Sequence, residues 1–413
     1  MPKITKILLL VVSVVLVLTV FLGVNSSGVN AATDGQDGAY RQINVYSEVL
    51  RHIQTDYVEE PNIPTVTNGA LRGLLESLDS DSSYLTPDDY KAFKEDKGGK
   101  AQVGINVSKR WGYATVVSVV PGSPADKANL NDGDIIEAIG TQDTRDLSLA
   151  VIRLMLEGTP GSELSLSVVR PRKAAPEKLT MTRVVTPLPP VGETMYENSS
   201  ILYLKPGVLD HEHVQQVESK LKGMSKAGNK KILLDLRDVA DGENAEAIRM
   251  ANFLLKSGTI VTLEGQKVEK QTFAAEGSKS INTSSPVVVL VNRGTAGPAE
   301  IVAAALMDNK RADVVGEKTF GEGSQQKTFE LPDGAALILS VAKYESPAGK
   351  KLEDEGVTPG VLVASNIDDN SPVDEDATPD SQQQQQPQQT KKPSVSVDEQ
   401  LNKALDLLKS KAA

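Results

Sequence analysis

The stretch ILLDL at residues 232–236 is apolar at every position except Asp235, and the stretch PVVVLV at residues 286–291 is apolar throughout. A strand that is buried on both faces reads as a continuous apolar run, whereas a half-exposed strand alternates apolar and polar residues. Helical patterns lie between and after these runs, over residues 243–255 and 298–308. This alternation of strands and helices predicts a layered α/β core over residues 187–366.

Residues 97–186, which precede this core, have a different pattern. Short β-rich runs are separated by Gly, Pro and Asp, and one helical segment at residues 148–157 interrupts them. We expect a β domain with a barrel-like sheet here. Residues 32–96 carry helical spacing instead, and Thr86 followed by Pro87 predicts the capped start of a short helix. The predicted fold class is therefore α/β and β multidomain, with an N-terminal helical region.

The N-terminus has the pattern of a targeting segment. Lys3 and Lys6 precede an unbroken apolar run at residues 7–24, which is 18 residues long. That length is close to the lower limit of a membrane span and exceeds the usual ~7–15 residues of a signal-peptide core. Two interpretations stay open for residues 1–31: a cleaved signal peptide, or an uncleaved anchor with its lysines inside the cell. Both predict an extracytoplasmic protein, either membrane-anchored through this segment or secreted into the periplasm or cell envelope.

The C-terminal part reads as a linker followed by a short helix. Residues 367–397 are acidic, contain proline and include a glutamine run at residues 382–386. This composition is typical of a disordered linker. Residues 398–413 place leucines at helical spacing behind Asp398, which we expect to cap the helix.

The composition excludes several classes of protein. The chain has 413 residues, with 44 Lys and Arg against 55 Asp and Glu, and a net charge of −11. This acidic balance argues against broad nucleic-acid binding, which needs cations to neutralise phosphates. There is no cysteine, so disulfides, thiolate nucleophiles and zinc sites built on Cys are excluded. His211 and His213 would point apart on a helix, and we predict no metal and no cofactor.

Residues 97–186 resemble a PDZ domain, a module that binds polypeptide C-termini. The motifs are GINV at residues 104–107, PGSPA at residues 121–125 and LNDGDII at residues 130–136. In such a domain a peptide adds a strand beside the first motif, and backbone N–H groups of the preceding loop hold its carboxylate. The resemblance implies that the peptide-binding residues are Gly104, Ile105, Asn106 and Val107.

The larger frame resembles the C-terminal processing (tail-specific) peptidase family over residues 40–365. That family combines an export signal, N-terminal helices, a PDZ domain and an α/β core with a Ser–Lys catalytic dyad. The motifs that carry the resemblance are LLDLR at residues 233–237, GTA at 294–296, EIVAAAL at 300–306, VVGEKTFG at 314–321 and GVTP at 356–359. The implied partners are polypeptide C-termini or unfolded proteins.

The chain departs from this family at the positions that would carry the chemistry. The family's nucleophilic serine falls at Gly297, and its catalytic lysine falls at Glu322. The glutamine that orients the lysine is retained as Gln326, whereas the glycine pair of the oxyanion region has become Asp241 and Gly242. Glycine cannot form an acyl-enzyme, and a carboxylate does not replace a neutral amine as the base. A carboxylate at Asp241 would also oppose the negative charge that an oxyanion site stabilises.

Other side chains offer replacements for the missing dyad. Thr295 lies just before the position of the serine, with Lys318 as a candidate base, and Ser324 follows Glu322 by two positions. A relocated dyad requires a nucleophile and a base within hydrogen-bond reach of each other. Asp241 and Glu322 would form a carboxylate pair, but without supporting histidines a solvated polar cleft is the better interpretation.

The favoured hypothesis is a catalytically silent pseudopeptidase of the cell envelope that binds polypeptide C-termini through its PDZ domain. It would regulate or scaffold a substrate or an active paralogue. The alternative is an active serine-type endopeptidase that processes protein C-termini through an unconventional site. A third hypothesis is a structural envelope protein whose C-terminal helix mediates assembly. No nucleic-acid partner is expected.

Overall fold

The structure is a computed structural model that describes residues 34–95, 101–170, 175–364 and 398–411. The chain divides into two compact units, residues 1–67 and residues 68–413. The predicted signal or anchor at residues 1–31 and the predicted linker at residues 367–397 lie outside the described residues. Within the described part, no helix is both long enough and apolar enough to cross a membrane.

Helices predicted for the N-terminal region are present. The first unit contains α2 (Asp34–Asp56) and the start of α3 (Ile63–Glu76). In the second unit, α4 (Pro87–Lys94) begins after Thr86, whose hydroxyl accepts a hydrogen bond from Asp89 N. The Asp89 carboxylate accepts one back from Thr86 N. This capping box satisfies N–H groups that the first turn of a helix leaves unpaired, so the predicted cap is confirmed.

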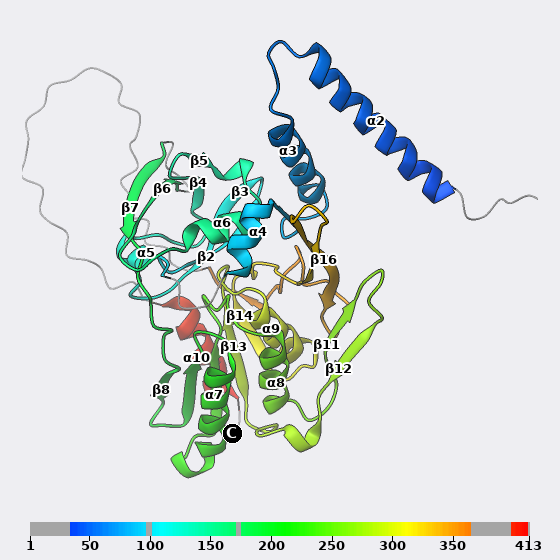
Figure 1. The fold of residues 1–413 in the computed structure, drawn as a ribbon. Coiled ribbons are helices and arrows are strands. Elements are labelled where there is room, and N and C mark those ends of the chain that lie inside the picture. The colour runs from blue at the N-terminus through cyan, green and yellow to red at the C-terminus, as the bar shows by residue number, and fades with distance from the viewer. Residues whose placement is uncertain (1–33, 96–100, 171–174, 365–397, 412–413) are drawn as a thin grey trace, which may run out of the picture. The chain divides into compact units, whose positions relative to one another are not determined.

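The β domain is built on a sheet with the strand order β2-β3-β4-β6-β7, and β5 pairs with β4. The strands are β2 (Ile105–Arg110), β3 (Tyr113–Val119), β4 (Ile135–Ile139), β5 (Gln142–Asp143), β6 (Glu163–Val169) and β7 (Glu177–Thr182). The domain predicted to be barrel-like is not a closed barrel: β2 and β7 are the two edges of the described sheet, and an isolated bridge joins Gln102, before β2, to Val184, after β7. Helix α6 (Leu149–Leu156) lies beside β2 instead and buries its apolar face in the core of the domain (Figure 1). A short helix, α5 (Pro124–Lys127), follows β3.

The α/β core is layered around a six-stranded sheet with the order β17-β14-β13-β10-β9-β8. Its strands are β8 (Gly192–Tyr196), β9 (Ile201–Lys205), β10 (Lys231–Asp235), β13 (Val287–Val291), β14 (Asp313–Gly316) and β17 (Val361–Leu362). All neighbouring pairs are parallel except β8 with β9. Every residue of β10 and β13 is buried, as their continuous apolar runs predict.

Alternate residues of the central strands face two helical layers. The helices of one layer are α7 (His211–Ala227), α8 (Asn244–Leu254) and α9 (Pro298–Asp308). Leu234 of β10 packs on this side. Leu233 faces the other side, where α10 (Glu399–Ser410) covers the sheet with Ala404 and Leu408 (Figure 1). The apolar face of α10 is therefore covered by its own chain, which argues against an assembly role for that face.

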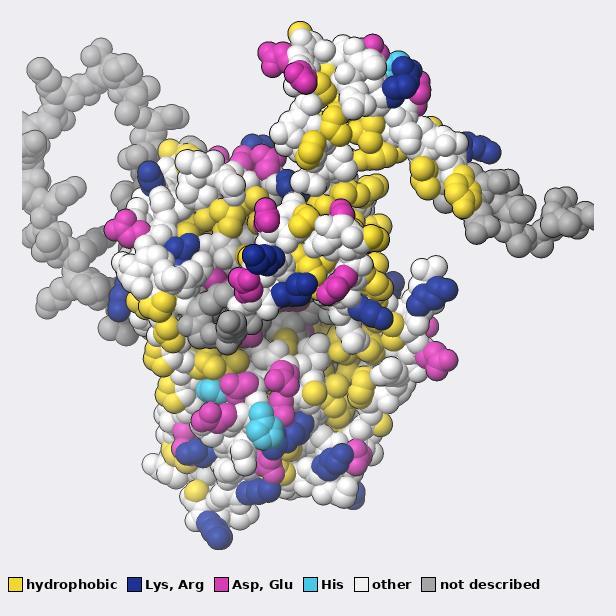
Figure 2. All heavy atoms as spheres, viewed as in Figure 1, with side chains coloured by type: hydrophobic (Ala, Val, Ile, Leu, Met, Phe, Trp, Pro, Cys, Tyr) yellow, Lys and Arg dark blue, Asp and Glu magenta, His cyan; other side chains and the backbone are white. Residues whose placement is uncertain are grey.

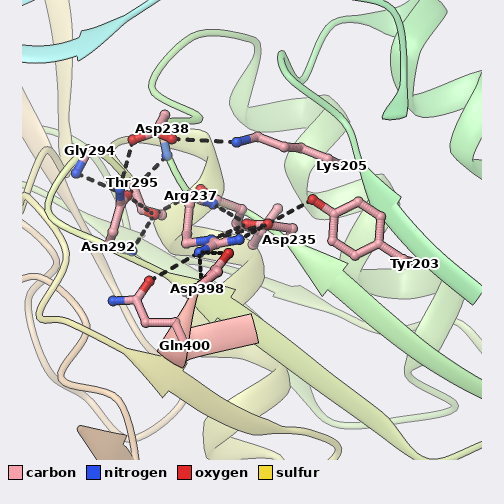
Figure 3. A network of polar contacts seen from close by, with 11 residues as sticks. Tyr203, Lys205, Asp235, Arg237, Asp238, Asn292, Gly294, Thr295, Asp398 and Gln400 are labelled. Carbon is pink, nitrogen blue, oxygen red and sulfur yellow. Dashed lines mark hydrogen bonds and ion pairs between the residues drawn. The ribbon is translucent and has the colours of Figure 1, made fainter. Parts of the chain in front are cut away.

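Polar contacts hold both ends of α10. Asp398 caps its first turn, as predicted, and pairs with the Arg237 guanidinium at 2.9 Å (Figure 3). Arg237 is also paired with the buried Asp235 at the end of β10, at 2.6 Å. At the other end, the Lys231 ammonium donates to two backbone carbonyl oxygens, each at 2.7 Å. The C-terminal helix is thus bound to β10, the strand whose following loop lines the candidate site.

A second sheet, in which all described pairs are antiparallel, carries the loop that completes the site. Its order is β1-β16-β11-β12, with β15 also paired to β16. The strands are β1 (Ser83–Leu85), β11 (Thr259–Glu264), β12 (Gln271–Ala274), β15 (Ser324–Glu330) and β16 (Ala336–Glu345). β1 is a short strand inside residues 32–96, where the sequence predicts a helical region. These three residues gain their strand hydrogen bonds from β16, which lies far away in the sequence.

Candidate functional site

One cavity of about 380 Å³ brings most of the predicted site residues together. β2 and α6 contribute one side, and the loop after β10, the start of α9 and the loop before β15 contribute the other. The predicted residues that line it are Ile105, Asn106, Val107, Asp241, Gly242, Gly297 and Glu322. Gly104 and Gln326 do not line this cavity, and Gln326 lines a neighbouring one instead. We call the 380 Å³ cavity the cleft.

Gly297 occupies the turn between β13 and α9. Its backbone has φ 55° and ψ −117°, a region that residues with a Cβ adopt only under strain. Pro298 follows and begins the helix. A Cβ added to Gly297 would lie 3.8 Å from Glu322 Oε2. The positions that correspond to the family's serine and lysine are therefore neighbours, with no hydroxyl at one and a carboxylate at the other.

Glu322 is paired with Arg153 of α6, with 3.4 Å between Oε1 and the guanidinium Nη2. Desolvation raises the pKa of Glu322, and the positive charge of Arg153 opposes this rise. The same guanidinium donates to the backbone oxygen of Val107, at 3.1 Å from Nη2 and 3.3 Å from Nε. Arg153 therefore connects β2 with the residue at the lysine position. Both side chains of the ion pair are partly exposed, so the pair itself adds little stability.

Two backbone N–H groups that line the cleft already have carboxylate acceptors. Gly297 N donates to Glu300 Oε2 at 2.9 Å, and Gly242 N donates to Asp241 Oδ1 at 2.8 Å. Gly242 has φ 134°, and a Cβ there would lie 2.5 Å from the backbone oxygen of Leu209, so no side chain fits. In an acyl-transfer site such N–H groups stabilise the developing oxyanion. Here an oxyanion would have to displace a carboxylate from each of them.

Glu300 holds the loop that carries Glu322. It is fully buried at the start of α9. It accepts hydrogen bonds from the Thr319 hydroxyl and from the backbone N–H groups of Gly297, Gly321 and Glu322. Burial raises the pKa of Glu300 to about 7, although these four donors favour the carboxylate. Sequence reasoning missed this role, and a glutamate inside an otherwise apolar helix start was the signal for it.

A second buried carboxyl group supports the other end of the same loop. Glu353 is 5% exposed, and its Oε2 accepts a hydrogen bond from Gly323 N at 2.7 Å. Burial raises the pKa of Glu353 to about 8, and the charge of Asp81 adds to this rise. Nothing in the sequence pattern near Glu353 predicts this contact, because its partner lies on another segment of the chain.

Ser324 lines the cleft and donates from Oγ to Asp81 Oδ2 at 2.7 Å. Burial raises the pKa of Asp81, while the hydrogen bond from Ser324 lowers it. Gln326 donates from Nε2 to the backbone oxygen of Asp81 at 2.8 Å. The resemblance implied that this glutamine orients the side chain at position 322. In the structure its amide is bound to Asp81.

Thr295, the other candidate nucleophile, is fully buried and its hydroxyl is already used. Oγ1 donates to the backbone oxygen of Leu236 at 2.8 Å and accepts from Asn292 N at 3.0 Å. Asn292 in turn donates to the Asp238 carboxylate at 2.7 Å (Figure 3). Thr295 does not line the cleft, and Lys318 is exposed. The hydroxyl of Thr295 therefore stabilises the turn before α9 through these two hydrogen bonds.

The outer edge of β2 borders the cleft. β3 pairs with one edge of β2, and no other strand of the described sheet pairs with the second edge. Gly104 precedes β2 with φ 84°, and a Cβ there would lie 2.3 Å from Ser123 Cβ, so only glycine fits. An unpaired edge can accept an added strand. The Val107 backbone oxygen on β2 accepts a hydrogen bond from Arg153, while Ile105 and Asn106 line the cleft.

The two histidines of α7 have separate partners. His211 Nδ1 lies 2.9 Å from Glu246 Oε1. His213 contacts Asp210, which caps α7, and the backbone oxygen of Pro189. Among the residues that the structure describes, no group of three or more His, Asp or Glu side chains could hold a metal ion.

A PDZ-type β domain and a peptidase-type α/β core that meet at one cleft define the class of this protein. Peptidase family S41 matches residues 201–363, and a PDZ domain matches residues 115–170. The chain belongs to the C-terminal processing peptidase family, peptidase family S41. The predicted family is thereby confirmed.

Relatives share this arrangement over most of the chain. Carboxyl-terminal-processing peptidase 2 of Arabidopsis thaliana, a chloroplastic protein, is 33% identical over 79% of this chain and 66% of its own length. The carboxyl-terminal-processing protease of Synechocystis sp. is 33% identical over 72% of this chain and 71% of its own. Among solved structures, the photosystem II D1 C-terminal processing protease matches with a TM-score of 0.66 and 25% identity, over 78% of this chain and 92% of that one.

Proposed function

We propose that this chain binds the C-terminal segment of a polypeptide in the cleft and does not cleave it through a Ser–Lys dyad. The observation that carries the proposal is the pair Gly297 and Glu322. A Cβ at position 297 would lie 3.8 Å from Glu322 Oε2. Glycine has no side-chain atom that could attack a carbonyl carbon.

The electrostatics of the cleft support the claim that the chain does not cleave the bound peptide. A Ser–Lys mechanism needs a neutral amine as base, and Glu322 offers a carboxyl group that is paired with Arg153. The N–H groups of Gly242 and Gly297 are bound by carboxylates. Negative charge next to a developing oxyanion raises the barrier to acyl transfer.

The unpaired edge of β2 supports the claim that the chain binds the C-terminal segment of a polypeptide. A peptide that adds as a strand there gains backbone hydrogen bonds, and its side chains give specificity. A peptide that extends along β2 as far as Val107 must replace the hydrogen bond from Arg153 to the Val107 oxygen with one from a peptide N–H. The free carboxylate is expected to lie near Gly104, at the start of β2.

A second candidate function is C-terminal processing by an unconventional serine-type site. The relatives are named as processing peptidases and proteases, which favours this activity over a silent role. Within the chain, Ser324 is the hydroxyl that favours it, because it lines the cleft 2.7 Å from the Asp81 carboxylate. A nucleophile within hydrogen-bond reach of a base is the minimum that such a mechanism needs.

One assay separates the two functions. The full chain is incubated with an unfolded reporter that has an apolar, free C-terminus, and binding and cleavage are measured together. We expect saturable binding without turnover. Cleavage that is lost in Ser324→Ala but kept in Ser219→Ala, an exposed serine of α7, would replace our proposal with the second function. Absence of binding would refute both.

The location and partners belong to the same proposal. The apolar run at residues 7–24 behind Lys3 and Lys6 supports a position outside the cytoplasm, either in the envelope or anchored to the membrane. A silent binder with an intact scaffold suits a regulator or scaffold of a substrate or of an active paralogue. Separation of cell fractions, followed by detection of the chain, tests the location.

A further inference from the structure

The position of α10 on the core is set by its own contacts and not by its connection to the rest of the chain. The Gln400 amide donates to the backbone oxygen of Val363 at 2.9 Å, although the two residues are 37 positions apart in the sequence. Residues 365–397 therefore join two points that are neighbours in space. A connection so much longer than the gap leaves the docking of α10 to the side chains of the helix and of the sheet.

Docking and folding of α10 are coupled. The helix has 12 residues, and a helix of that length is only marginally stable in water without a partner. Ala404 and Leu408 are fully buried in one cluster with Leu233 of β10. If α10 left the sheet, it would expose these side chains and lose the packing that stabilises it. Hydrogen exchange of the α10 amides therefore measures its docking.

The first turn of α10 holds the guanidinium of Arg237 (Figure 3). Arg237 Nη1 donates to both carboxylate oxygens of Asp398, at 3.0 and 2.9 Å, and to Gln400 Oε1 at 3.4 Å. The other side of the guanidinium is bound by Asp235, which is fully buried. Burial disfavours the charged form of Asp235, but Arg237 outweighs burial and lowers the pKa of Asp235. Arg237 is thus fixed between a carboxylate of β10 and the cap of α10.

Arg237 begins the loop that lines the cleft. The next residue, Asp238, has φ 63°, in the left-handed region that residues with a Cβ seldom adopt. Its backbone N donates to Asn292 Oδ1 at 3.0 Å, and its carboxylate accepts from Asn292 Nδ2 at 2.7 Å. Residues 240–242, which follow, line the cleft. The conformation of this loop therefore depends on contacts at its start.

Asn292 extends the network to the second loop of the cleft. Gly294 N donates to Asn292 Oδ1 at 3.1 Å, and Asn292 N donates to Thr295 Oγ1 at 3.0 Å. This turn leads to Gly297, which lines the cleft. The two segments that bring the N–H groups of Gly242 and Gly297 to the cleft are thus joined to the residue that α10 holds (Figure 3).

We propose that Asp398 and Gln400 of α10 are positioning residues for the cleft, and that docking of α10 increases the affinity of the cleft for a polypeptide C-terminus. This inference rests on the proposed binding function and deepens it. Loops that are ordered before binding lose less conformational freedom when the peptide binds. Coupling between two sites is reciprocal, so a bound peptide also strengthens the docking of α10.

The test uses the full chain and a labelled peptide with a free, apolar C-terminus. Fluorescence anisotropy measures the affinity for the peptide, and hydrogen–deuterium exchange measures the protection of α10 and of residues 238–242. We expect a saturating concentration of peptide to slow the exchange of the α10 amides about fivefold, which is the lower end of coupling between sites. A helix that serves only to cover the sheet would exchange at the same rate with and without peptide.

Asp398→Asn separates the positioning role from the stability of the helix. Asparagine is also a good helix cap and keeps an oxygen for Leu401 N, but it has no charge to hold Arg237. We expect weaker peptide binding, by a factor similar to the effect on exchange, and faster exchange of residues 238–242, while α10 stays helical. Gln400→Ala, at the other contact to Arg237, should weaken binding in the same direction.

Lys409→Gln is the matched control on the same helix. It removes an ion pair with Glu197, 3.0 Å long, near the end of α10 that does not contact Arg237. Both side chains of this pair are about half exposed, so the pair adds little to stability. We expect the peptide to bind this variant as it binds the unmodified chain.

The outcomes distinguish the positioning role from the proposed function. Unchanged peptide affinity in both Asp398→Asn and Gln400→Ala, or α10 exchange that does not respond to the peptide, would overturn the positioning role and keep the binding function. Equal weakening in Asp398→Asn and Lys409→Gln would show a general effect of helix stability and would also overturn it. If the unmodified chain does not bind the peptide, the proposed function fails and this inference fails with it.

Discussion

At the scale of single residues, restoration of the family's dyad is the direct test of the cleft. We expect the double variant Gly297→Ser, Glu322→Lys to fold but to cleave poorly. The serine would inherit a backbone with φ 55°, which costs ~1–3 kcal/mol for a residue with a side chain. The new lysine would also lie beside Arg153. The measurement is single-turnover cleavage of an unfolded reporter.

Asp241→Gly as a third substitution should help more than either of the first two alone. It removes the carboxylate that accepts from Gly242 N, and the parts of such a site act as a unit. Rapid cleavage by the double variant, with no further gain in the triple variant, would contradict our view that Asp241 opposes the oxyanion.

Two buried carboxyl groups predict how stability depends on pH. Burial raises the pKa of Glu300 to about 7 and that of Glu353 to about 8, from an unfolded value of 4.5. The folded state therefore binds more protons than the unfolded state in this interval. Their contribution is fully present below pH 4.5 and is lost as the pH rises through 7 and 8. The unfolding free energy should fall over that range.

Urea unfolding at several pH values checks this dependence. Glu353→Gln should flatten the upper part of the fall, because the amide cannot ionise. Glu212→Gln, at an exposed glutamate of α7, should keep the slope of the unmodified chain. An unchanged slope in Glu353→Gln would show that Glu353 does not take up the proton.

At the scale of elements, α10 depends on its N-terminal cap. Asp398→Ala removes the acceptor for the first turn and the partner of Arg237. Loss of a helix cap costs ~0.5–2 kcal/mol, so we expect the unfolding free energy to fall by about that amount. Chemical denaturation measures the change. Asp406→Ala, an exposed position on the same helix, should have a much smaller effect, and equal losses would refute the role of the cap.

The elements differ in how well local patterns predict them. β10 and β13 are long apolar runs, so their burial is visible in the sequence. The caps at Thr86 and Asp398 are local too, because the side chain bonds a backbone group three residues away. β1 has no such signal, since its three residues form a strand only by pairing with β16.

At the scale of the whole molecule, Arg153 joins the β domain to the α/β core. Arg153→Ala frees the Val107 oxygen and removes the ion pair between Arg153 and Glu322. We expect peptide association to become faster, because no hydrogen bond must be exchanged before a strand adds to β2. Stopped-flow fluorescence measures the rate. Arg145→Ala, at an exposed arginine of the same domain, serves as the control, and equal rates in the two variants would contradict the exchange.

Acidic and basic side chains are interspersed on the face drawn in Figure 2. The net charge of −11 argues against broad nucleic-acid binding by the chain as a whole. It does not indicate which charged side chains form ion pairs. The pairing of Arg153 with Glu322 joins residues 169 positions apart. The contact of Gln326 with Asp81 joins residues 245 positions apart, and it moves Gln326 away from the role that the family resemblance implied.

The sequence by itself determined the family, the buried strands, the capped helices and the identity of the residues at positions 297, 322 and 241. These features depend on residue types and on spacings of a few residues, which local sterics and hydrogen bonds decide. Only the tertiary structure decided that Glu300 and Glu353 hold the loop around Glu322, that Thr295 is buried in a turn, and that the Gln326 amide is bound to Asp81. Those features arise from contacts between distant segments, whose geometry is set when both sheets and their helices pack together.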